Sequence, residues 1–180
     1  MIQKLTLACL FLGFFCITEA RAEFYTGIGF GSALNGGGAT TNGDDSSFKN
    51  SYGYSIFGGY ELPITFMDAR VEAEFLYLKA PVKDGDDRNF KGVMFNAVGV
   101  IPFVPVVDPY VGLGIGYSRF DHTNTVAWQA IGGVDYQLPF APVVIGGEYR
   151  YLTTTEGTGK KNSTSNFHSN ILMLKAKYMF

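Results

Sequence analysis

The residues from Ile171 to Phe180 alternate between two faces with a period of two, which indicates a β-strand. One face carries two lysines, whereas the other is apolar from end to end. A membrane β-barrel needs such a strand at this position, because its last strand closes against its first. The apolar face comprises Leu172, Leu174, Ala176, Tyr178 and Phe180.

The first residues, Met1 to Ala22, have the pattern of a secretory signal peptide. Lys4 supplies the positive charge, Leu5 to Ile17 is an apolar run, and Ala20-Arg21-Ala22 is a small-x-small cleavage site. The apolar run is too short to span a bilayer as a helix. We expect cleavage after Ala22, so that residues 23–180 form a single outer-membrane β-barrel domain.

The composition of the remaining chain favours an all-β fold. Both cysteines, Cys9 and Cys16, precede the cleavage site, so the mature chain is expected to hold no disulfide and no cysteine-based metal site. A net charge of −2 argues against nucleic acid as a partner. No segment has a convincing helical period or the length of a transmembrane helix. Alternating segments are instead separated by clusters of Gly, Pro, Asn and Asp, which is typical of β-strands and turns.

We predict a transmembrane antiparallel up-and-down β-barrel of eight strands. The connections after the second, fourth and sixth strands contain proline and are fairly short. Two of the others, 34–50 and 153–167, are long and polar, and this asymmetry is typical of outer-membrane barrels. The predicted strands are Phe24–Ala33, Ser51–Leu62, Asp68–Leu78, Lys91–Phe103, Pro109–Phe120, Thr125–Gln137, Val143–Leu152 and His168–Phe180.

One face of each strand is mostly apolar and is expected to contact lipid. When the strands are oriented by the predicted topology, the aromatic residues fall near the two ends of the barrel. Aromatic girdles on either side of an apolar band are typical of bilayer interfaces. The predicted girdle residues are Phe30, Tyr54, Tyr77, Trp128 and Tyr151 at the outer end, and Tyr60 and Tyr136 at the periplasmic end.

The opposite face of each strand is polar, small or charged and is expected to line the lumen. Its acids and bases nearly balance, which favours a lumen plugged by ion pairs, and eight strands enclose only enough room for side chains. An ion-conducting path is the alternative. A soluble lipocalin-like barrel would need the reverse, an apolar interior and a polar exterior. The predicted lumen charge network is Glu61, Arg70, Glu72, Glu74, Asp135, Glu148, Arg150, Lys175 and Lys177.

Several motifs together resemble the small eight-stranded outer-membrane proteins of the opacity-protein and OmpA transmembrane-domain superfamily. They include Phe24-Tyr-Thr-Gly-Ile-Gly-Phe-Gly, Pro109-Tyr-Val-Gly-Leu-Gly-Ile-Gly-Tyr117 and Glu148-Tyr-Arg-Tyr151. The resemblance implies an outer-membrane location, contact with lipid and lipopolysaccharide, and loops that often contact host-surface molecules. It also implies that the barrel-assembly machinery reads the last strand, with Leu172, Leu174, Tyr178 and Phe180 as the assembly signal.

No catalytic, metal or cofactor site is predicted. His168-Ser169-Asn170 invites comparison with barrel lipid A deacylases, but adjacent strand residues point to opposite faces, so His168 and Ser169 are not expected to meet. The sequence therefore favours a non-enzymatic outer-membrane protein with a structural or surface-interaction role. A narrow channel is the second hypothesis, and a barrel enzyme acting on lipid is the third.

Overall fold

A computed structural model of the chain describes residues 23–41, 44–47, 51–64, 67–80, 88–101, 106–120, 123–155, 157–158 and 164–180. The predicted signal peptide, residues 1–22, lies outside this range. Within the described residues, no helix has the length and apolar character to cross a membrane.

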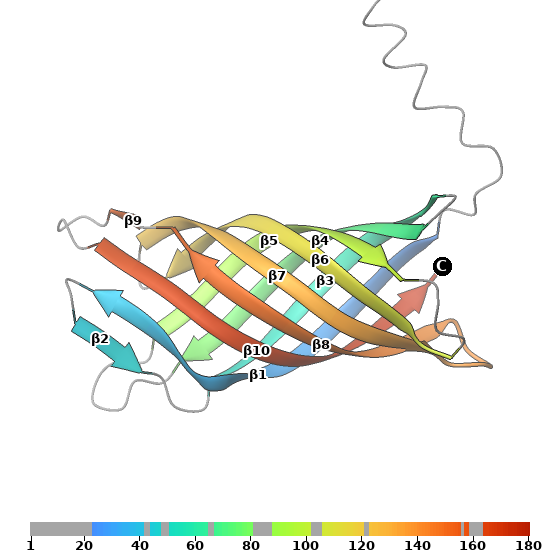
Figure 1. Ribbon diagram of the computed structural model, residues 1–180, viewed down its shortest axis with the longest axis horizontal. Coiled ribbons are helices and arrows are strands. Elements are labelled where there is room, and N and C mark those ends of the chain that lie inside the picture. Colours follow the sequence, from blue (N-terminus) through green and yellow to red (C-terminus); the bar gives the residue numbers. More distant parts are fainter. Residues whose placement is uncertain are drawn as a thin grey trace, which may run out of the picture.

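Eight antiparallel strands close into a barrel (Figure 1), which confirms the predicted fold class. The barrel closes where β1 pairs with β10, from Tyr25 opposite Met179 to Leu34 opposite Asn170. Both ends of the strand sequence, Phe24 and Met179, lie at the end of the barrel with the short turns, which we call the turn end; the opposite end is the loop end. The barrel strands in order are β1 (Phe24–Thr41), β3 (Tyr52–Ile64), β4 (Met67–Ala80), β5 (Arg88–Val100), β6 (Asp108–Phe120), β7 (Thr123–Gln137), β8 (Val143–Thr154) and β10 (Thr164–Met179).

The two long polar segments were expected to be loops, and the structure corrects this. At the loop end, β1 continues to Thr41 and β10 begins at Thr164, and both pair beyond the barrel with short additional strands. These are β2 (Asp44–Ser47), which pairs with β1, and β9 (Gly157–Thr158), which pairs with β10. Apolar and polar residues do not alternate in these segments, so their sequence carries no signal for a strand.

The register between β1 and β10 shifts between Leu34 and Gly38, beside the run of glycines that follows Asn35. A bulge of this kind bends a strand, and glycine accommodates it without a steric penalty. The predicted fourth strand, Lys91–Phe103, is also shifted: β5 runs from Arg88 to Val100. Pro102 follows two residues later in the sequence, and proline has no backbone N–H to donate to a sheet.

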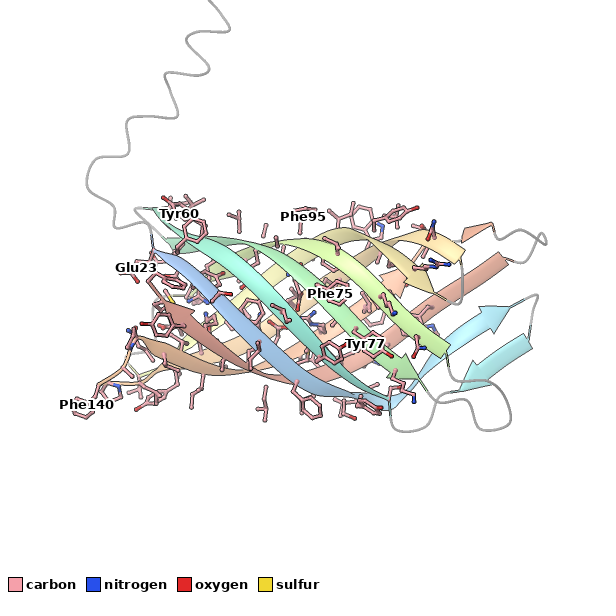
Figure 2. The ribbon with its side chains drawn as sticks, turned by 180° about the vertical axis from the view of Figure 1, so that it is seen from behind. Glu23, Tyr60, Phe75, Tyr77, Phe95 and Phe140 are labelled. Carbon is pink, nitrogen blue, oxygen red and sulfur yellow. The ribbon has the colours of Figure 1, made fainter. Side chains whose placement is uncertain are left out.

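Side chains alternate between the outer wall and the interior along every barrel strand, and the outer set projects from the wall in Figure 2. Phe30, Tyr54 and Tyr77 lie side by side in register on β1, β3 and β4, and the rings of Tyr54 and Tyr77 stack at 5.0 Å. Tyr60 lies toward the opposite end of the barrel from Tyr77 (Figure 2) and contacts Phe24 edge to face at 5.4 Å. The remaining predicted girdle residues, all exposed on the outer wall, are Trp128, Tyr136 and Tyr151.

Inward-facing glycines allow neighbouring strands to approach closely, and we expect Gly31→Ala to destabilise the barrel. A Cβ at Gly31 would overlap the carbonyl oxygen of Leu172 and lie 2.6 Å from Cγ of Met173, at the β1–β10 junction. Overpacking of this kind costs roughly 1–3 kcal/mol. Gly147→Ala is the matched control, because a Cβ there meets no atom within 4 Å. Urea titration of both variants in lipid vesicles tests this expectation, and equal stabilities would contradict it.

Candidate functional site in the barrel interior

An ion-pair cluster lies inside the barrel near the turn end, and we call it the rim cluster. The Asp135 Oδ2 atom on β7 lies 2.6 Å from Nη1 of Arg70 on β4 and 2.6 Å from Nζ of Lys177 on β10. Nε of Arg70 also lies 2.7 Å from Oε1 of Glu61 on β3. The cluster therefore joins four strands and balances two acids with two bases.

A second group of charges, the central cluster, is centred on Arg150 of β8, whose side chain is completely buried. Its Nη1 atom lies 3.0 Å from Oε2 of Glu74 on β4, and its Nε donates to Oε1 of Glu148 at 2.9 Å, while Nη2 contacts the same oxygen. Lys175 Nζ on β10 lies 3.0 Å from Glu148 and 3.5 Å from Glu72. Arg150 is thus held by two carboxylates in a region closed to water.

Neutral side chains hydrogen-bond to several other groups of the central cluster, although Oε1 of Glu74 is buried without a hydrogen-bond partner. The Tyr25 hydroxyl donates to Oε1 of Glu72 at 2.8 Å, and the Tyr110 hydroxyl donates to Oε2 of Glu148 at 3.0 Å. The ammonium of Lys175 also lies 4.1 Å from the ring centroid of Phe57, a favourable cation–π contact. Two amides that hydrogen-bond to each other and to Glu74 complete the cluster: Asn96 and Gln129.

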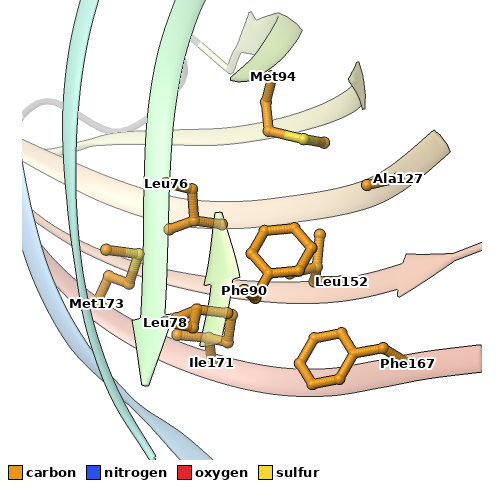
Figure 3. Close-up of a cluster of buried hydrophobic side chains, with 9 residues drawn as sticks. All are labelled: Leu76, Leu78, Phe90, Met94, Ala127, Leu152, Phe167, Ile171 and Met173. Carbon is orange, nitrogen blue, oxygen red and sulfur yellow. The ribbon is translucent and has the colours of Figure 1, made fainter. Parts of the chain in front are cut away.

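Nine apolar side chains form a buried cluster in the interior (Figure 3), and we call this group the plug. Most of them lie on the loop side of the charges, whereas Met94 and Met173 are in register with Glu74 and Glu148. Along β4, Glu72 and Glu74 are followed by Leu76 and Leu78 on the same inward face, and the rings of Phe90 and Phe167 stack at 5.6 Å. Most of the plug therefore lies between the central cluster and the loop end. Its members are Leu76, Leu78, Phe90, Met94, Ala127, Leu152, Phe167, Ile171 and Met173, none more than 2% exposed.

The plug corrects the expectation that the inner face is polar, small or charged throughout. A signal for it is present in the sequence, because the inward positions of β10 change from Ile171 and Met173 to Lys175 and Lys177 along one face. To predict that these apolar positions lie at a similar height in the barrel, the direction and the register of every strand must be known. The structure supplies that register and places all nine residues of the predicted charge network at the turn end and centre of the interior.

The predicted assembly-signal residues lie on the outer face of β10. Leu172, Leu174, Tyr178 and Phe180 are all exposed, the last two rings pack edge to face at 5.1 Å, and the Phe180 backbone N–H donates to the carbonyl of Phe24 at 2.9 Å. On the same strand, His168 is exposed and Ser169 is buried, so the imidazole and the hydroxyl lie on opposite faces. Among the described residues, no three acidic, histidine or cysteine side chains are grouped to hold a metal ion.

Comparison with known proteins supports the same architecture. Residues 7–180 match the family model described as the outer membrane protein beta-barrel domain. No protein of curated function matches the chain in sequence. Similar folds occur in Neisserial surface protein A (17% identity, 89% of this chain and 100% of that one, TM-score 0.69) and in OprG from Pseudomonas aeruginosa (12% identity, 90% and 97%, TM-score 0.54).

A third similar structure is Ail, the attachment invasion locus protein of Yersinia pestis (20% identity, 89% of this chain and 100% of that one, TM-score 0.50). At these identities the likeness shows the fold alone, whereas the family model covers nearly the whole chain. The chain belongs to the outer membrane protein beta-barrel domain family, and its barrel lies in the bacterial outer membrane.

Proposed function

We propose that this protein is a non-enzymatic barrel with a closed lumen, which presents its loop end at the cell surface as a contact surface for other molecules. The turn end, where both ends of the strand sequence lie, faces the periplasm in this proposal. The long polar segments 34–50 and 153–167 then face outward. This orientation follows the general asymmetry of outer-membrane barrels, which have short periplasmic turns and longer extracellular loops.

The filled interior is the observation that carries the proposal. A solute that entered from the loop end would meet the plug first, and then a central cluster whose cations are all engaged by carboxylates. Passage would require apolar side chains to separate and buried ion pairs to break, and both processes are costly. A barrel closed in this way acts through its outer surfaces and its loops.

The loop end is built to support such contacts. Residues Gly38–Thr41 of β1 pair on one side with β2 and on the other with Ser165–His168 of β10, so paired backbone continues beyond the barrel. Loops carried on a rigid scaffold are common binding surfaces. The fold relative Ail has been solved in complex with the heparin analogue sucrose octasulfate, which makes sulfated glycans a reasonable first probe.

A narrow channel is the second hypothesis, since charged side chains line part of the interior. A channel would need an open path through the part of the lumen that the plug occupies. An enzyme acting on lipid is the weakest hypothesis, because Ser169 and His168 lie on opposite faces of β10.

The test removes the outer segments and keeps the barrel. Residues 34–50 and 155–166 are each replaced by Asn-Gly, which joins Ala33 to Ser51 and Thr154 to Phe167, positions that already lie opposite each other on neighbouring strands. We expect the shortened protein to stay heat-modifiable on gels but to lose binding to host cells and heparin-coated surfaces. The control replaces residues 81–87 with Asn-Gly and should bind like the full chain. Absence of binding by the full chain, or undiminished binding by the shortened one, would contradict the proposal.

A further inference from the structure

The three turns at the turn end are unusually apolar. The segments 62–67, 101–107 and 138–142 contain no charged residue, and Thr65 is their sole polar side chain. Turns that face water usually carry Gly, Asn, Asp or Ser. Each segment instead opens with leucine or isoleucine, then proline, then another large apolar residue: Leu62-Pro63-Ile64, Ile101-Pro102-Phe103 and Leu138-Pro139-Phe140.

The described parts of these turns present their apolar side chains outward. Phe140 is 100% exposed, Val106 is 68% exposed and Ile64 is 52% exposed. Figure 2 shows Phe140 projecting past the strand ends, at the same end of the barrel as Tyr60. Ile64 at the end of β3, and Val106 and Phe140 in two of the turns, are thus exposed at one end of the barrel.

The turn that carries Phe140 is fixed by hydrogen bonds. The backbone N–H of Leu138 donates to the carbonyl of Val143 at 2.9 Å, and the N–H of Ala141 donates to the carbonyl of Leu138 at 3.3 Å. The N–H of Met179 on β10 donates to the carbonyl of Pro142 at 2.9 Å. The ring is therefore held outward by the fold.

Among the described residues, the outward-facing strand positions next to these turns carry no charged side chain. Glu23, Asp68 and Asp108 lie two residues before the inward-facing Tyr25, Arg70 and Tyr110, and Glu61 pairs with Arg70, so these acids fall on the inward side of their strands, where Asp68 is exposed at the strand end. The outward-facing positions at this end include five aromatic residues: Phe24, Tyr60, Tyr136, Tyr178 and Phe180. The apolar turns are continuous with the surface that contacts lipid.

We infer that Ile64, Val106 and Phe140 belong to an apolar collar at the turn end, and that this collar lies in the phospholipid of the periplasmic leaflet. The collar extends the lipid-facing wall of the barrel past the ends of its strands, so the barrel sits deeper in this leaflet than its strand lengths require. Large apolar and aromatic side chains partition favourably into this interface, and the hydrogen-bonded turn 138–142 presents Phe140 there without further ordering. Phospholipid is the occupant because the collar continues a surface already in contact with lipid. The inference does not depend on what the loops bind.

The test places a tryptophan at the tip of the collar. The full chain carrying Trp128→Phe and Phe140→Trp is refolded into phosphatidylcholine bilayers with or without bromine on the acyl chains, and heat-modifiable migration checks folding. The same background with Asn124→Trp, an exposed position at the loop end, is the control. If the Phe140→Trp variant does not fold, Ile64→Trp takes its place.

The collar predicts that brominated lipid removes most of the fluorescence of the Phe140→Trp variant and that this emission is shifted to shorter wavelength than in the control. Acrylamide added to the water should quench the control more strongly. Emission at long wavelength that acrylamide quenches and brominated lipid does not would overturn the inference. It would leave the collar as a surface for a periplasmic protein.

Discussion

Arg150→Met is expected to lower the free energy of unfolding by about 3–5 kcal/mol, since removal of one partner of a buried ion pair leaves an uncompensated charge. Arg150 is completely buried and makes ion pairs with Glu74 and Glu148. Without it, both carboxylates stay in an interior closed to water, with Lys175 as the nearest remaining cation of Glu148. Urea titration in lipid vesicles, followed by tryptophan fluorescence, gives the difference directly.

The control for this substitution is Lys91→Met, which removes a cation from an exposed position on β5. The ammonium of Lys91 lies 5.7 Å from the ring centroid of Tyr77, a contact of the kind worth about 0.5–1 kcal/mol when exposed. If both variants lose equal stability, the central cluster contributes no more than a surface charge does. That result would contradict the role assigned to it here.

Phe90→Ala should also cost about 3–5 kcal/mol, the usual range for removal of a buried aromatic ring. The ring of Phe90 stacks on Phe167 in the plug, and strands enclose the plug on all sides. Because the strands are hydrogen-bonded in register, the wall cannot collapse into the space that the ring leaves. The same variant is expected to loosen the closure of the lumen, so its conductance should be recorded alongside its stability.

Phe95→Ala is the matched control for the plug. Phe95 lies on the same strand but faces outward, and it is 62% exposed. Lipid is fluid and can fill the space outside the wall, so this substitution leaves no cavity and its cost should be less than half that of Phe90→Ala. A larger loss for Phe95→Ala would mean that packing inside the barrel is not what stabilises it.

Alternation of side chains carries most of the information about this fold. In β4, the sequence Arg70-Val-Glu-Ala-Glu-Phe75 separates charged positions from apolar ones residue by residue, which predicts both the strand and its two faces. Only the barrel buries the charged set and exposes the apolar set to lipid. The same alternation places glycines repeatedly at inward positions of β1, and one of them, Gly31, leaves room for the neighbouring strand β10.

The plug could not be derived in the same way. Leu76 on β4 and Leu152 on β8 both face inward and both follow the charged residues of their own strands. That they lie at a similar height in the barrel follows only once the direction of the two strands and the register between neighbouring strands are known. A one-residue change of register reverses every side chain, and a two-residue change shifts its level. The paired extensions of β1 and β10 were missed for another reason: in polar, glycine-rich sequence the backbone pairs without a repeating side-chain pattern.

Closure of the lumen is tested most directly by single-channel recording on residues 23–180 refolded into a planar bilayer, with heat-modifiable migration as the check on folding. The plug and the two ion-pair clusters predict a folded protein that shows no discrete openings. Reproducible openings that change in size when Glu72 or Arg150 is neutralised would contradict this account and would identify the protein as a narrow channel.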